Sequence, residues 1–95
     1  MWIGYLEIDL HVPDSGSLKS KRAVLKSIKD RVRSRYNVTV AEFGGEDKWQ
    51  GSSLALVTVS SDKRMVNSML DKIVDWFNGL KDVYVLDYRI DFLNE

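Results

Sequence analysis

The spacing of apolar residues changes several times along this chain, and each change marks the border of a structural element. Alternating apolar and polar residues are typical of a β-strand with one buried face, whereas apolar residues three or four positions apart are typical of a helix. The pattern predicts strands at 2–12, 38–43, 53–60 and 83–92, and helices at about 18–36 and between the Ser61-Asp62 cap and Gly79. Ser17, after the break at 13–16, is the expected N-cap of the first helix.

This order of elements restricts the fold to a few topologies. Strand, helix, strand, strand, helix, strand is the α+β arrangement called ferredoxin-like, β-α-β-β-α-β. Right-handed crossovers then place both helices on one face of a four-stranded antiparallel sheet, with the first and third strands at its centre. Ninety-five residues are the size of one domain, so we expect a single domain over residues 1–95.

The patterns of the third and fourth strands predict which of their side chains are buried. Residues 53–60 have apolar side chains on both faces of the strand, with Leu54 and Leu56 on one face and Ala55, Val57 and Val59 on the other. One of these sets must lie on the face that the helices leave open, and covering it favours a homodimer or higher homo-oligomer. In the last strand every second residue is apolar, and these residues are expected to be buried: Tyr84, Leu86, Tyr88, Ile90 and Phe92.

The net charge of zero conceals two oppositely charged parts of the chain. Residues 17–36 carry eight cations and one anion, a balance of +7, whereas the rest carries six cations and thirteen anions, a balance of −7. At about 100° per residue, five of the cations follow one flank of the first helix, and three crowd its first turn, where acids are usual. The predicted anion-binding residues are Lys19, Lys21, Arg22, Lys26, Lys29 and Arg33.

Two interpretations of this basic helix remain open. Like charges three or four residues apart destabilise an isolated helix, by about 0.2–0.5 kcal/mol a pair, so an anion should face them. That anion is either an external polyanion such as RNA, or the acids of the chain itself, for example Asp14 and the C-terminal acids, or of a second subunit.

The open sheet face is a less favourable place for nucleic acid. Glu7, Asp9 and His11 of the first strand should lie beside acidic residues of the last strand, and the face lacks the aromatic pair of RNA-binding sheets. RNA is therefore expected on the helix side. A metal or general-base role for Glu7, Asp9 and His11 is disfavoured, because acids are common on a solvated sheet face. Trp49 is interpreted as a plug over the sheet or into a partner rather than a stacking platform.

Several classes of protein are disfavoured by composition. The chain has no cysteine, which excludes disulfides and thiolate chemistry, and no apolar run of the length that spans a membrane. We expect a cytoplasmic protein with no membrane association, no cofactor, no metal and no catalytic residues. Acylphosphatases share the topology, but their glycine-rich loop with a phosphate-binding arginine is missing after the first strand, so an enzyme is disfavoured.

Several short motifs together resemble one bacterial family. They are His11-Val12-Pro13, the run 17–22 (SLKSKR), the run 37–42 (NVTVAE), the run 47–50 (DKWQ), the run 59–62 (VSSD) and the run 86–88 (LDY). Spread over the whole chain, they resemble the YlxP-like family of unknown function. The resemblance implies a ferredoxin-like fold and brings no catalytic residues. It also implies an RNA or ribosome connection, because genes of this family tend to sit among those for transcription termination, translation initiation and ribosome maturation.

Together these features predict a non-enzymatic protein associated with RNA or the ribosome through its basic first helix. The alternative is a homo-oligomeric small-ligand-binding or regulatory module, which the doubly apolar third strand favours.

Overall fold

The computed structural model describes residues 1–13, 16–44 and 51–95. Asp14 and Trp49, with the expectations attached to them, lie outside the described residues. The elements are β1 (Trp2–His11), α1 (Leu18–Arg35), β2 (Thr39–Phe43), β3 (Gly51–Ser60), α2 (Lys63–Asn78) and β4 (Tyr84–Asn94).

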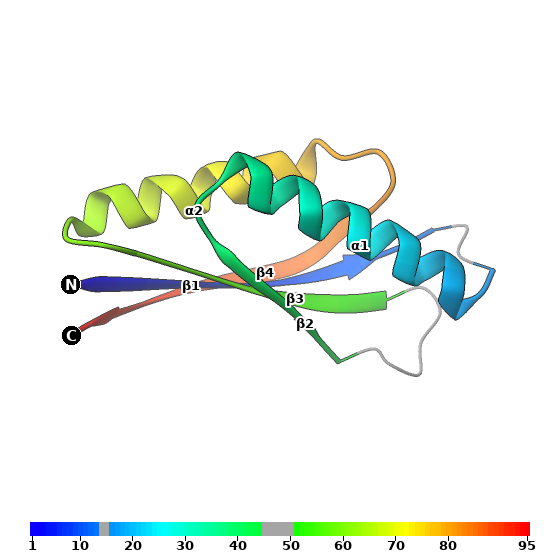
Figure 1. Cartoon of the computed structure of the whole chain (residues 1–95), viewed down its shortest axis with the longest axis horizontal. Helices are drawn as coiled ribbons and strands as arrows, with labels where there is room; N and C mark the ends of the chain where they lie inside the picture. The colour runs from blue at the N-terminus through cyan, green and yellow to red at the C-terminus, as the bar shows by residue number, and fades with distance from the viewer. Residues whose placement is uncertain (14–15, 45–50) are drawn as a thin grey trace.

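The four strands form one antiparallel sheet in the order β2-β3-β1-β4, and both helices cover the same face of it (Figure 1). The ferredoxin-like prediction, with the first and third strands central, is confirmed. The helices begin where the caps predict. The Ser17 hydroxyl accepts a hydrogen bond from the Ser20 backbone N–H at 3.1 Å, and the Asp62 carboxylate accepts one from Arg64 N–H at 2.9 Å.

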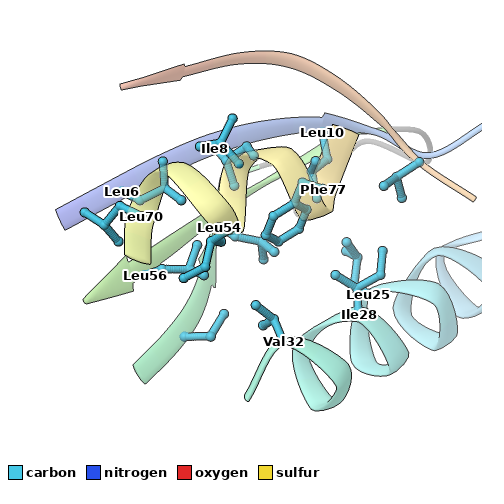
Figure 2. Close-up of a cluster of buried hydrophobic side chains, with 14 of the residues drawn as sticks. Leu6, Ile8, Leu10, Leu25, Ile28, Val32, Leu54, Leu56, Leu70 and Phe77 are labelled. Atoms are coloured by element: carbon cyan, nitrogen blue, oxygen red, sulfur yellow. The ribbon is translucent and has the colours of Figure 1, made fainter. Parts of the chain in front are cut away.

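The core lies between the sheet and the two helices (Figure 2). Alternate residues of the central strands point into it, and each helix contributes one apolar stripe. Among the fully buried members are Leu6, Ile8, Leu10, Leu25, Ile28, Val32, Leu54, Leu56, Leu70 and Phe77. Leu54 and Leu56 therefore face the helices, which leaves Ala55, Val57 and Val59 on the open face.

Gly4 sets how closely α2 packs on β1. A Cβ at this position would lie 2.1 Å from Val66 Cγ1 and 2.9 Å from Leu70 Cδ1, both on α2. Because real Cβ contacts are essentially never this short, any other residue would force these two α2 side chains to shift. The missing side chain thus allows Val66 and Leu70 to contact the strand directly.

The expectation for the first part of β4 was wrong. A register shift opposite Asp9 and Leu10 pairs Leu10 with Val85 and Asp9 with Asp87, so Leu86 is an extra residue in the ladder. Such a β-bulge reverses which residues face the core. Val85 accordingly packs against the core, whereas Tyr84 and Leu86 are exposed. Tyr88, which pairs with Ile8 beyond the bulge, was also expected to be buried, but it is 48% exposed on this edge strand.

Candidate nucleic-acid interface

Helix α1 presents its cations beside its apolar stripe. Leu25, Ile28 and Val32 are buried, so the flank next to them runs along the outside of the molecule. Five residues lie on this flank, and we call them the basic row: Lys19, Arg22, Lys26, Lys29 and Arg33. Lys29 is half-buried, and the other four are exposed. The first turn of α1 contains no acid, as the sequence indicates.

Lys21 departs from the rest of the predicted anion-binding residues. Only 4% of its surface is exposed, and its ammonium nitrogen donates to the Gly51 carbonyl oxygen at 3.2 Å, where β3 begins. The helical wheel explains this position, because Lys21 precedes Leu25 by four residues and so falls on the buried stripe. Lys21 connects α1 to the sheet and is not part of the basic row.

Asp30 lies between two cations of the basic row. Its carboxylate oxygens accept hydrogen bonds from Lys26 Nζ and Arg33 Nη2, each at 3.0 Å. The hydrogen bonds from Lys26 and then from Arg33 hold the pKa of Asp30 below its usual value. All three side chains are well exposed, so these are surface ion pairs of small stabilising effect.

Lys29 has a partner on the sheet. Its ammonium nitrogen lies 2.7 Å from Glu42 Oε1 on β2, in the least exposed ion pair of the row. Sequence reasoning missed Glu42, although a signal was present. Glu42 lies two residues after the buried Val40 on the same strand, so both side chains point to the face that carries the helices.

Lys19 and Arg22 differ from the other three members of the row. Within residues 1–13, 16–44 and 51–95, neither forms an ion pair with an acid, and both are exposed. Among the described residues, acids therefore neutralise the C-terminal part of the row and not its N-terminal part. The macrodipole is positive at this same end of α1, which adds to the local positive potential.

The other flank of α1 faces α2 and carries a different set of contacts. Arg31 pairs with Asp82 at 3.0 Å, and its guanidinium lies 5.9 Å from the centre of the Trp76 ring. This cation fastens the two helices together and is distinct from the basic row.

On the open face, each of the three metal or general-base candidates contacts another side chain. Glu7 accepts hydrogen bonds from Arg89 and Tyr5, Asp9 accepts one from Ser53 at 2.6 Å, and His11 stacks on Tyr84. Burial, and then the hydrogen bond to Glu7, raises the pKa of Tyr5. In the described part of the chain, no three acidic or histidine side chains are grouped so that they could hold a metal ion.

Comparison with known proteins places the chain in a family. A family model described as "Protein of unknown function (DUF503)" matches residues 3–90. The chain belongs to this family. It is also 36% identical over 81 residues to "Uncharacterized protein YlxP" of Bacillus subtilis (strain 168), an alignment that covers 85% of this chain and 88% of that protein. The resemblance to YlxP-like proteins is confirmed, and its family description assigns no activity.

The two helices of this DUF503 chain can be compared with the expectation that the protein has no membrane association. Neither α1 nor α2, the two helices of the described residues, combines the length and the apolar character needed to cross a bilayer.

Proposed function

We propose that this DUF503 protein is a cytoplasmic, non-enzymatic factor that binds RNA or an RNA surface of the ribosome through the basic row of α1. The observation that carries the proposal is the exposed pair Lys19 and Arg22, which have no acidic partner among the described residues. A phosphate backbone supplies closely spaced anions to such a row.

The internal ion pairs of the row do not prevent this binding. Exposed pairs such as Lys26–Asp30 contribute only about 0.2–1 kcal/mol. In addition, the ammonium and guanidinium groups have several N–H donors, so Lys26 and Arg33 can contact phosphate while one donor remains on Asp30. The proposed contact residues are therefore Lys19, Arg22, Lys26 and Arg33.

A double substitution tests the proposal. Lys19→Ala/Arg22→Ala should lose most RNA retention, by about tenfold or more in affinity, because two phosphate contacts are removed. Its melting temperature should stay the same or rise slightly, because like-charge repulsion along α1 is relieved. RNA retention from cell extract and thermal unfolding are measured on the same preparations.

Two control variants make this result specific. Lys63→Ala/Lys81→Ala removes the same charge away from α1 and should retain RNA, which separates a local contact from a net-charge effect. Lys21→Ala lies in the same turn as Arg22 but should lower stability instead, because its amine bonds to the Gly51 carbonyl. Lower stability with unchanged RNA retention in the Lys19/Arg22 variant would contradict the proposal and favour an intramolecular role.

A second candidate, a homo-oligomeric small-ligand-binding or regulatory module, is supported by the open sheet face. Val59, Ile3 and Leu93 lie in register across β3, β1 and β4, and form one apolar row on that face. Val59 is 57% exposed and Leu93 is 53% exposed. Covering this row with a second copy would remove apolar surface from water.

We expect sedimentation velocity to show a dimer or larger species at concentrations of tens of micromolar. Val59→Lys should shift the distribution to monomer, because it places a charge within the covered apolar row, while Lys81→Ala should leave it unchanged. A wild-type chain that sediments only as monomer would remove the oligomeric candidate and leave the α1 proposal intact.

A further inference from the structure

A hollow lies between the end of α1 and the first half of α2, and neither Lys19 nor Arg22 lines it. Its volume is about 360 Å³, which is at the small end of the range of ligand pockets, roughly 300–1,000 Å³. Six residues line it: Tyr36, Arg64, Met65, Ser68, Met69 and Lys72.

Helical spacing divides the α2 side of this pocket into a floor and a rim. Met65 and Met69 are four residues apart and form an apolar floor. Met65 is 63% exposed, although it is a large apolar side chain, so no part of the described chain covers it. Arg64, Ser68 and Lys72 follow the adjacent i, i+4, i+8 line and form a polar, cationic rim.

Tyr36 closes the pocket from the α1 side. It is the C-cap of α1, and its backbone N–H donates to the Val32 carbonyl at 2.9 Å, which fixes its position. The half-buried side chain packs beside the core and lines the pocket. Tyr36 follows Arg33 by three residues, so the pocket lies near the end of α1 at which the basic row also ends, and no member of the row lines it.

The cations on the rim are available to a ligand. The Arg64 side chain is 93% exposed, and its only ion pair within the described ranges is a 3.7 Å contact with Asp62. Lys72 forms no ion pair with any acid in those ranges. An aromatic ring, an apolar floor and two exposed cations together are complementary to a flat ring that carries a phosphate.

We propose that this pocket binds one unpaired nucleotide of an RNA strand whose backbone follows the basic row, an inference that rests on the proposed function. The base lies against the Tyr36 ring and the two methionine side chains, and its phosphates contact Arg64 and Lys72. The pocket shares Met65 and Met69 with a second hollow of about 210 Å³ beside Asn37 and Ser60, which gives the strand a path onward.

The proposal predicts a preference for single-stranded RNA. Sequence-specific RNA-binding proteins commonly stack unpaired bases on aromatic side chains, which a base inside a duplex cannot reach. The basic row alone would bind both kinds of strand, because both carry phosphates and phosphate contacts do not read the bases. Loss of the single-strand preference on substitution of Tyr36 therefore reports on the pocket rather than on α1.

The three methionines of the chain provide a direct readout by methyl NMR. Titration with a short oligoadenylate, or with 5′-AMP, should shift the Met65 and Met69 methyl resonances through the ring current of the base. Met1, which lies outside the pocket lining, is the internal reference. Ribose 5-phosphate lacks the base and should produce much smaller shifts.

Substitution of Tyr36 gives the matching affinity measurement. Tyr36→Leu should weaken oligoadenylate binding by about tenfold, within the range measured for loss of a base–aromatic stack, and should leave binding of a blunt RNA duplex unchanged. Tyr36→Phe retains the ring and should bind as the wild type does. Tyr84→Leu, a tyrosine on the open face, is the control for loss of an exposed ring.

The outcomes separate the pocket from the proposed function. If neither oligoadenylate nor 5′-AMP shifts Met65 and Met69, the pocket proposal is overturned, whatever the α1 variants do. Shifts induced only by an acidic, leucine-containing peptide would also overturn it and indicate a protein partner. If the methyls shift with 5′-AMP but Lys19→Ala/Arg22→Ala retains RNA normally, the pocket is supported and the α1 proposal fails.

Discussion

Phe77→Ala is expected to destabilise the fold by about 3–5 kcal/mol, the usual cost of removing a buried aromatic ring from a core. Phe77 is fully buried and is the largest such side chain in the described chain. It extends from α2 toward the side of the core where Leu25 and Ile28 of α1 lie (Figure 2), and Trp76 contacts it edge to face. Its removal would leave a cavity between both helices and the sheet.

The measurement is urea unfolding followed by circular dichroism. Since small domains are stable by only about 5–15 kcal/mol, the variant should lose a large part of its total stability, with a lower midpoint and an unchanged slope. Phe77→Leu, which keeps most of the apolar volume, should lose much less. A loss below about 1 kcal/mol for Phe77→Ala would show that the core closes around the gap, and that Phe77 does not join the helices.

Periodicity predicted most of this fold because the two helices and the two central strands each bury one regular face. The stripe through Leu25, Ile28 and Val32 could be read directly from spacing. The bulge in β4 could not, because neither glycine nor proline interrupts the alternation there. Pairing with β1 decides the position of Leu86, and that pairing is a property of the sheet and not of the β4 sequence.

The candidate site was predictable to a similar extent. The helical wheel locates the basic row, and the same wheel places Lys21 on the buried stripe. The pairing of Lys29 with Glu42 depends on the antiparallel register of β2, which composition does not determine. The pocket was missed because Tyr36 and Met65 are distant in sequence, and only the packing of α1 beside α2 brings them together.

RNA binding by the basic row should weaken steeply with salt. Each phosphate contact to a single strand contributes about 0.7 to the slope of log affinity against log salt, so the four exposed cations predict a slope near −2.8. Between 50 and 200 mM salt the affinity should then fall by about 50-fold. Arg64 and Lys72 would steepen the slope further if the strand reaches the pocket. Fluorescence anisotropy with a labelled oligonucleotide measures the slope.

Single substitutions should change this slope in a predictable direction. Arg22→Ala should reduce its magnitude by about 0.7 and weaken binding similarly across sequences. Asp30→Asn should act in the opposite sense, because it removes the negative charge between Lys26 and Arg33 and so strengthens RNA binding several-fold. The two interpretations of α1 disagree on this variant. If the acids of the chain were the intended partners of the row, Asp30→Asn would lower the melting temperature and leave RNA binding unchanged.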